Sequence, residues 1–403
     1  MTKSKQDNPA RCTLCPGLCE LGLGWRGPDL PRVEYPTAAG AGLCPRGAAL
    51  GELLASPQRI RWPRRLEAGK PVEMKLDHAI AAAAGRMARG ATVLVDGATL
   101  PIEEMAAAAE VAAAWGGVRL CCVVAPEDEQ VLLGVEASGA TYLTDEELAH
   151  CDGFVIVGDA FAANPRCARG VLDAVRAGKR VPVVVMDSGG GVSGGFATLR
   201  IDCPAGGELA ALAGEKVSSA VSSCGKLAVL IAPEPGRGGS WRRLGYVAGK
   251  LANDHRGGVA VQTTGANALA AVRARQQLGL LSPAEAMTPS QAGSVRVALG
   301  VDVLGVLGWE GPPVAVAAAA MPNRTTESAE LTLPLALPCE MGGTALQAGT
   351  RPVKFSALLP PPAGVPTPAE LLRKLAAAAG VDLGPRTSKV PTLERLAADA
   401  DRQ

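Results

Sequence analysis

Aromatic residues are scarce in this sequence, where phenylalanine, tyrosine and tryptophan together make up 3% of 403 residues. Large rings therefore cannot fill most of the interior, and we expect a core built mainly from alanine, valine and leucine. An excess of charge is also missing, because 40 basic and 39 acidic residues give a net charge of +1. Proteins that bind nucleic acid or acidic membranes usually carry a basic excess, so we expect neither partner.

Long apolar runs are missing as well. The first residues, MTKSKQDNPAR, contain no apolar signal core, and no uncharged run approaches the roughly 20 residues that span a bilayer. The 11 cysteines are an odd number, and those beyond Cys44 follow no regular framework, which fits a reducing compartment. We therefore expect a soluble, cytoplasmic protein. Walker and His-Glu-x-x-His motifs are absent from the sequence, which leaves nucleotidase and zinc-dependent hydrolase functions without support.

Four cysteines near the N-terminus form the most informative pattern. Cys12, Cys15, Cys19 and Cys44 have the spacing C-x2-C-x3-C-x24-C. Four thiolates suffice to hold a [4Fe–4S] cluster, with three ligands from a tight loop and a fourth returning from a distance. Zinc is an alternative, although structural zinc sites usually pair two C-x2-4-C knuckles and only one is present here. Cysteines without a metal are the remaining alternative, and the spacing favours the cluster.

Strand-like and helix-like patterns alternate through the rest of the chain. Apolar runs predict strands at 91–97, 118–124, 152–159, 181–187, 226–233, 257–265, 301–308 and 313–320. Helical patterns lie between most of them, and such alternation is typical of parallel sheets covered on both faces. The two halves echo each other weakly, since each has a strand, a small polar loop and a short strand. We expect two Rossmann-like α/β units, one inserted in the frame of the other.

Composition and pattern together predict four segments. We expect a four-cysteine iron–sulfur module at 1–65, an α/β domain at 66–220 and a second α/β domain at 221–335. A C-terminal return segment with a helix would occupy 336–403.

Three stretches resemble the molybdopterin oxidoreductase family. The cysteine pattern, followed by Pro45-Arg46-Gly47 and Ser56-Pro57-x-Arg59, resembles the family's N-terminal cluster module. The stretch DGFVIVGDAFAANPRCARGVLDAVRAGKRVPVVVMD resembles its strand–loop–helix–strand, and SAELTLPLALPCEMGGTALQAGTRPVKFSALLPPPAG resembles a later stretch. Nearly the whole chain is covered, and the resemblance is closest to the B-type subunit of formylmethanofuran dehydrogenase. It implies an α/β fold with a [4Fe–4S] module and two Rossmann-like parallel-sheet domains (domains I–III), without the terminal domain IV barrel.

The resemblance also implies a cofactor and residues that bind it. In the family, a bis-molybdopterin guanine dinucleotide with tungsten or molybdenum sits near the carboxyl ends of strands, where helix N-termini favour phosphate. The matching loops are 158–166, 187–195 and 263–267. We expect cofactor contacts from Gly158, Asn164, Asp187, Ser188, Gly265 and Asn267. The alternative is that these glycines only form turns. Arg46 would bridge cluster and pterin, although it is also an ordinary surface arginine.

Cys122 is the candidate catalytic metal ligand. The family's B-type subunit has a Cys-His pair after its second strand, and this chain has Cys122-Val123 at that place, so the histidine is missing. A soft thiolate suits tungsten or molybdenum, whereas a cysteine in an apolar strand is usually a small buried hydrophobe. We expect the other distant cysteines to be core residues, namely Cys151, Cys167, Cys203, Cys224 and Cys339.

Two hypotheses of function follow from the resemblance. In the first, the chain is the redox subunit of a formylmethanofuran dehydrogenase that interconverts CO2 and a formyl or formate group, with the cofactor carrying the chemistry. In the second, it is a non-redox scaffold of a bacterial formyltransferase/hydrolase complex that has lost the tungsten or molybdenum site. Both hypotheses imply partner subunits, and the metal content would separate them.

Overall fold

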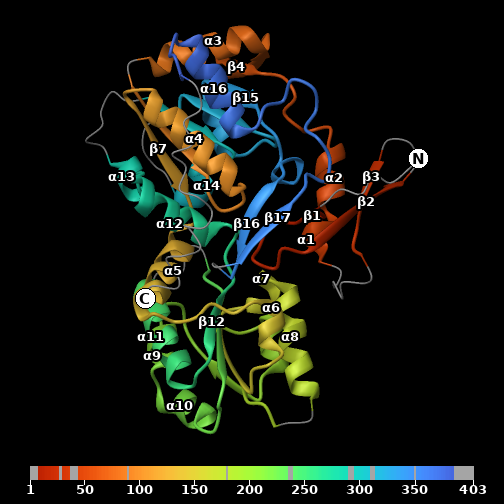
Figure 1. Ribbon diagram of the computed structural model, residues 1–403, viewed down its shortest axis with the longest axis vertical. Helices are drawn as coiled ribbons and strands as arrows, with labels where there is room; N and C mark the ends of the chain where they lie inside the picture. The colour runs from red at the N-terminus through yellow and green to blue at the C-terminus, as the bar shows by residue number, and fades with distance from the viewer. Residues whose placement is uncertain are drawn as a thin grey trace.

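Two units with parallel sheets and a small cysteine-bearing segment make up the fold (Figure 1). The computed structural model describes residues 8–26, 30–36, 44–88, 90–177, 180–234, 239–288, 295–308, 314–348 and 351–384. One sheet and its helices fill the upper half of Figure 1 and the other the lower half, with the cysteine-bearing segment beside their junction. The expectation of an α/β fold with parallel sheets is confirmed.

The lower unit is a five-stranded parallel sheet. Its strands, in spatial order, are β10 (Leu199–Asp202), β9 (Val183–Asp187), β8 (Gly153–Val157), β11 (Leu227–Ile231) and β12 (Gly258–Val261). Every residue of β8, β9, β11 and β12 is buried, which explains why these strands read as continuous apolar runs. The helices of this unit are α6 (Asp145–Leu148), α7 (Ala160–Ala163), α8 (Pro165–Arg176), η2 (Val192–Phe196), α9 (Glu208–Leu212), α10 (Glu215–Val221) and α11 (Trp241–Asp254).

The upper unit is a seven-stranded mixed sheet. Its strands, in order, are β5 (Lys70–Glu73), β4 (Arg64–Glu67), β15 (Leu331–Pro334), β14 (Val316–Ala319), β13 (Val295–Leu299), β6 (Ala91–Asp96) and β7 (Val118–Val123). The five strands from β15 to β7 pair in parallel, and β4 and β5 add antiparallel strands at one edge. Its helices are α3 (Leu76–Met87), α4 (Ile102–Ala114), α12 (Ala268–Leu278), α13 (Pro283–Met287), α14 (Val303–Leu307), α15 (Arg324–Ser328) and α16 (Pro368–Ala378), and α5 (Pro126–Ser138) packs between the units against α11 and α12.

The five-stranded unit is an insertion in the seven-stranded one, as the internal echo predicted. The chain makes β6 and β7, then all of β8 to β12, and only then β13 to β15, which return to pair with β6. The expected boundary between 220 and 221 differs from this arrangement, because it separates β10 from β11 within one sheet. The boundary between 65 and 66 also passes through β4. The sequence pattern shows where strands lie but not which strands pair, since pairing here joins residues far apart in the chain.

The prediction of a strand at 301–308 is wrong. Those residues contain the short helix α14, and the strand is β13, which ends before Gly300. Gly300 has φ +75° and Gly308 has φ +57°, so left-handed backbone flanks the helix at both sides. A short apolar run such as VDVLGVLG does not distinguish a strand from a helix by periodicity alone.

The cysteine-bearing segment is small and contacts both units. It contains β1 (Ala10–Arg11), β2 (Glu20–Arg26), β3 (Leu30–Glu34), α1 (Pro45–Ala48) and α2 (Leu50–Ala55). An antiparallel pair, β16 (Gly343–Gln347) and β17 (Arg351–Phe355), follows η4 (Pro338–Glu340) and lies beside it (Figure 1). The buried core is rich in alanine, valine and leucine, as the scarcity of aromatic residues predicted. None of the helices in the described ranges combines the length and the apolarity that crossing a membrane requires.

Candidate functional site

The four cysteines of the N-terminal motif lie within electrostatic reach of one another. Cys12, Cys15 and Cys19 are buried and Cys44, at the N-cap of α1, is half-buried. A backbone hydrogen bond of 2.9 Å from Cys12 N to Cys19 O closes the loop that carries the first three thiols. Burial raises the pKa of Cys12 to about 11, and the neighbouring Cys19 and Cys44 add to the increase.

The donor set suits an iron–sulfur cluster, but it is not a preformed metal site. Burial raises the pKa of Cys15 to about 12, so binding of a metal would have to drive deprotonation of the thiols. Among the described residues, no three His, Cys, Asp or Glu side chains are grouped so that they could hold a metal ion. The thiols would therefore have to close around the cluster as it is inserted.

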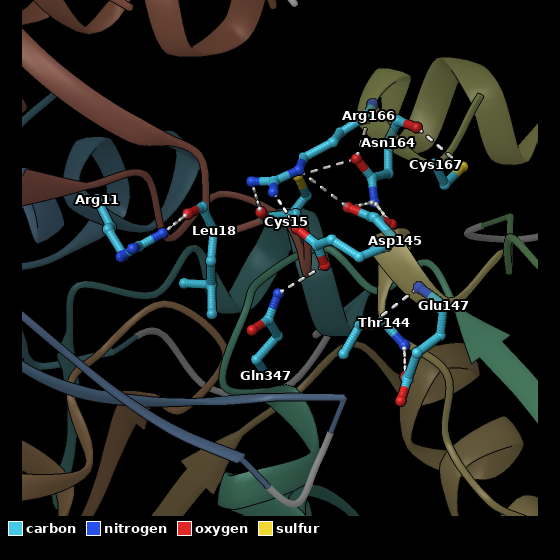
Figure 2. A network of polar contacts seen from close by, with 12 residues as sticks. Arg11, Cys15, Leu18, Thr144, Asp145, Glu147, Asn164, Arg166, Cys167 and Gln347 are labelled. Atoms are coloured by element: carbon cyan, nitrogen blue, oxygen red, sulfur yellow. Dashed lines mark hydrogen bonds and ion pairs between the residues drawn. The ribbon is translucent and has the colours of Figure 1, made fainter. Parts of the chain in front are cut away.

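Asn164 joins the cysteine loop to the carboxyl edge of the five-stranded sheet. It is 1% exposed, and Figure 2 shows it between Cys15, Asp145 and Arg166. Its Nδ2 donates to Asp145 Oδ1 at 3.1 Å and to Gln262 Oε1 at 2.9 Å. Its Oδ1 accepts from Arg166 N at 3.1 Å, which caps α8, and from Cys15 Sγ at 3.9 Å. Asn164 was predicted as a cofactor contact, and in this structure its amide is occupied by protein groups.

Two arginines attach the cysteine loop to the same edge. Arg166 Nη1 donates to Gly17 O at 3.0 Å, and its guanidinium also pairs with Asp145 at 3.8 Å and with Glu146. Burial raises the pKa of Cys19, and the charge of Arg166 opposes that increase. Arg46 donates to Ala162 O at 3.1 Å and to Ala163 O at the end of α7. Arg46 therefore connects the cysteine segment to the five-stranded unit, and its bridge between a cluster and a pterin stays a prediction.

The loops after β8 and β9 meet around two carboxylates. Asp159 caps α7 and accepts hydrogen bonds from Val192 N at 2.8 Å and from Ser193 N at 2.9 Å. Partial burial would raise the pKa of Asp159, but the bonds from Ser193 and Val192 outweigh it and lower that pKa. Asp187 pairs with Arg200 at 2.9 Å, while its Oδ2 is buried without a partner among the described residues.

Two predicted cofactor contacts on these loops, Gly158 and Ser188, lie in different environments. A Cβ on Gly158, whose φ is +75°, would lie 2.6 Å from Ala232 O, so glycine is required there by the backbone itself. Ser188 is exposed to solvent. The turn-only alternative thus accounts for Gly158, whereas the hydroxyl of Ser188 is open to a ligand.

The remaining predicted pair fixes the connection from β12 to α12 against the loop after β6 and against β16. Asn267 is fully buried; its Nδ2 donates to Leu100 O at 2.7 Å and its Oδ1 accepts from Leu346 N at 3.0 Å. A Cβ on Gly265 would lie 2.3 Å from Ala98 O, so the chain passes too closely for any side chain. Both residues thus have structural roles that account for their presence.

Cys122 lies inside the core and not at a cavity. It is fully buried in the main hydrophobic cluster, and burial raises the pKa of its thiol to about 12. This is the environment of a small core residue rather than of an accessible thiolate. Cys121, Cys151, Cys167, Cys203, Cys224 and Cys339 are also buried.

The cavity at the junction of the two units is too small for a pterin cofactor, and neither the loop 158–166 nor the loop 187–195 lines it. The cavity at this place measures about 40 Å³ and is lined by residues that include Pro16, Thr144, Asp145, Gln262 and Leu346. Small-molecule sites commonly measure about 300–1,000 Å³, and a dinucleotide-linked pterin is a large ligand. With the amides of Asn164 and Asn267 already bonded, the described residues here offer a water-sized space and few free groups.

Some members of this polar network carry no motif in the sequence. Asp145 and Gln262 both bond to Asn164, and Gln262 is 98 residues away along the chain. Burial raises the pKa of Asp145 to about 6, although the hydrogen bond from Asn164 acts in the opposite direction and lowers that pKa. The one local signal is the capping box of Thr144 and Glu147, which places Asp145 in the first turn of α6.

Comparisons with known proteins give similarity of fold and not of sequence family. No model of a known protein family matches the chain, and no curated protein sequence matches it. The structure is similar to acetylene hydratase from Pelobacter acetylenicus, with a TM-score of 0.61, 10% identity, and coverage of 93% of this chain and 69% of that one. It is also similar to a chain of the formyltransferase/hydrolase complex (FhcABCD) from Methylorubrum extorquens, solved in complex with methylofuran. That TM-score is 0.56 at 17% identity, covering 79% of this chain and 100% of the other.

Proposed function

We propose that this chain is a non-redox scaffold subunit, of the B type, in a formyltransferase/hydrolase-type complex of C1 metabolism, with a [4Fe–4S] cluster on its cysteine segment. Two features together support the proposal: the similarity of fold to a chain of that kind of complex, and the small size of the cavity between the two sheet units. The chain spans all of a chain from the FhcABCD complex, while the cavity at the junction of the two units measures about 40 Å³. A cluster held by Cys12, Cys15, Cys19 and Cys44 would supply one-electron transfer or purely structural cross-linking.

The chain's own residues would hold that cluster against the sheet unit. Asn164 and Arg166 contact the loop of Cys15 and Cys19, and Arg46 follows Cys44 and bonds to the end of α7. These contacts fix the orientation of three ligands from one side. They also exclude water from the loop, since Cys12, Cys15 and Cys19 are each 6% exposed.

Exposed apolar residues at one sheet edge support a role in a complex. Trp62, Leu66 and Val72 are 64%, 38% and 43% exposed, and they lie in or beside β4 and β5, at the edge of the seven-stranded sheet. Apolar side chains at an open strand edge are typical of a surface that another protein covers. We infer that a subunit with formyltransferase or hydrolase activity packs there.

A second candidate function is the redox subunit of a formylmethanofuran dehydrogenase. The observation that favours it is the cysteine spacing, because an electron-carrying cluster serves a redox partner. In that case the bis-pterin, with tungsten or molybdenum, would require the two units to separate at their junction, and Cys122 would have to become accessible.

Metal analysis of the complex purified anaerobically from its native source separates the two functions. The scaffold function predicts about four irons per chain without tungsten or molybdenum, and Cys15→Ser should remove the iron while the matched core change Cys151→Ser keeps it. Stoichiometric tungsten or molybdenum would overturn the scaffold assignment in favour of the redox subunit. Stoichiometric zinc without iron would overturn the cluster.

Assembly is tested by co-purification of the named kinds of partner. Trp62→Gln should release formyltransferase- and hydrolase-type subunits, whereas Trp25→Gln, which changes another tryptophan that is 55% exposed, should not. A chain that purifies alone from its native source as a stable monomer contradicts the proposal.

A further inference from the structure

The guanidinium of Arg166 lies against the loop that carries Cys15 and Cys19. Arg166 is the second residue of α8, in the inserted five-stranded unit, and its side chain is 22% exposed. Its Nη1 donates to Gly17 O at 3.0 Å, and the guanidinium also donates a hydrogen bond to the sulfur of Cys19. Figure 2 shows Arg166 reaching toward the loop of Cys15. A positive charge of one unit is therefore held in contact with a thiol of another segment.

The cysteine loop is shaped for this close contact. A Cβ on Gly17 would lie 2.9 Å from Asn164 Oδ1 and 3.4 Å from Asp145 Oδ2, so a side chain there would push the loop away from the sheet unit. Leu18 has φ +44°, a left-handed backbone that such a residue adopts only under constraint. The carbonyl of Leu18 accepts from Arg11 Nη1 at 2.9 Å. The loop is therefore fixed from two sides, and its distance from α8 is set by the fold.

Two carboxylates share the charge of Arg166. Asp145 lies 3.8 Å from Arg166 Nε, and Glu146 contacts Nη2. The side chain of Asp145 is 10% exposed, whereas that of Glu146 is 54% exposed and also accepts from Gln347 Nε2 at 3.4 Å. Glu146 can therefore be neutralised without opening a buried contact. Neutralising Arg166 and neutralising Glu146 should change the charge beside Cys19 in opposite directions.

Charges and hydrogen bonds near the sulfurs set the reduction potential of an iron–sulfur cluster. One-electron reduction adds a negative charge that the cluster shares with its four thiolates. A cation in contact with one thiolate stabilises the reduced state more than the oxidised state, and so it raises the potential. The thiols of Cys12 and Cys15 accept hydrogen bonds from backbone N–H groups of their own loop. The contact to Cys19 differs because it comes from another unit of the fold and carries a full charge.

We propose that Arg166 is a positioning residue that orients Cys19 toward the cluster and raises the cluster's reduction potential. The inference rests on the [4Fe–4S] cluster proposed above and assigns to a residue of the inserted unit a role in tuning it. Because the guanidinium belongs to α8, the potential depends on the contact between the five-stranded unit and the cysteine segment. A change that moved the two apart would lower the potential without altering any of the four ligands.

Reductive titration with dithionite, followed by the paramagnetic resonance signal of the reduced cluster, tests the inference on the anaerobically purified complex with the full chain. Arg166→Gln should lower the potential by about 60 mV, which is a tenfold change in the one-electron equilibrium. Arg166→Lys keeps the charge but loses the planar fork, so it should lower the potential by less. Glu146→Gln removes a competing carboxylate and should raise the potential, a sign that a merely structural role of the pair would not produce.

Arg169→Gln is the matched control, because Arg169 lies on the same helix with its side chain 60% exposed. It should change the equilibrium by less than about twofold, as expected for a screened surface charge. Equal potentials in the wild type, Arg166→Gln and Arg169→Gln would overturn the inference. Where Arg166→Gln holds no iron, Glu146→Gln decides, and an unchanged or lower potential in that variant overturns the inference. A wild-type chain without iron would overturn the proposed cluster itself, and the role of Arg166 with it.

Discussion

A buried ion pair between Arg59 and Glu340 connects the cysteine segment to the C-terminal return of the chain. Arg59 Nη1 lies 2.6 Å from Glu340 Oε1, and Nη2 contacts Oε2, so the contact is bidentate. Both side chains are 2% exposed. Leu337 N also donates to Glu340 Oε2 at 2.8 Å, which ties the pair to η4. The perturbation that tests this connection is Arg59→Met, which keeps much of the volume and removes the charge.

The expected cost follows from leaving Glu340 as an uncompensated buried carboxylate. Removal of one partner of a buried pair typically destabilises a protein by about 3–5 kcal/mol, whereas replacing both partners by apolar groups is often nearly neutral. Arg59→Met and Glu340→Leu should each lower the unfolding free energy by about that amount. The double variant should lose far less stability than the sum of the two single losses. Most of its loss should be the roughly 1 kcal/mol that comes from removing the acceptor of Leu337 N–H.

Urea unfolding of the four proteins gives this double-mutant cycle directly. An exposed pair is the control: Arg32 and Glu34 lie 2.7 Å apart but are 52% and 46% exposed, and Arg32→Met should cost less than about 1 kcal/mol. The reasoning fails if Arg59→Met costs no more than Arg32→Met. It also fails if the effects of Arg59→Met and Glu340→Leu simply add.

Three further outcomes follow from the structure. Gly158→Ala should destabilise more than Gly190→Ala, because both have positive φ but only the former would press a Cβ against Ala232 O; thermal unfolding compares the two. Burial raises the pKa of Asp128 to about 6, so the folded chain keeps this proton to a higher pH than the unfolded chain does. Stability should fall by roughly 3 kcal/mol between about pH 4 and pH 6, and Asp128→Asn should flatten that slope in unfolding measured across this range. Asn164→Ala leaves buried partners unpaired and should cost about 2–4 kcal/mol in urea unfolding, against less than about 0.5 kcal/mol for Gln58→Ala, whose side chain is exposed.

The positions of most strands could be predicted because buried parallel strands have a plain sequence signal. The runs FVIV and VVVM occur where β8 and β9 are found. The order of strands could not be predicted, because β6 pairs with β13 across a long insertion and the chain carries no local mark of that pairing. The run at 301–308 is as apolar as a strand. The positive φ of the flanking glycines, Gly300 and Gly308, is consistent with the helix found there, but these angles are known only from the folded backbone.

The cofactor and metal roles of the site residues stay predictions, but the structure shows which of those residues it brings together. Asn164 was selected as a cofactor contact from the family-like stretch that leads into α8, and the structure places it beside the cysteine loop. Its partners Asp145 and Gln262 come from distant segments, so only the folded chain brings them together. Cys122 was selected by its place in a motif, but access to a thiol depends on packing from several elements, and here these bury it completely.

The insertion of the five-stranded unit has a consequence for synthesis of the chain. On the ribosome, β6 and β7 emerge early, but β13, which pairs Val297 with Val93, emerges only after the entire inserted unit has been made. The inserted strands have all their partners within a contiguous stretch, so they can fold first as the nascent chain lengthens. Until then β6 and β7 would present unpaired apolar edges, the kind of surface that chaperones bind. The seven-stranded sheet should therefore close late, and the slowest folding step should be the docking of β13 rather than any event near the cysteines.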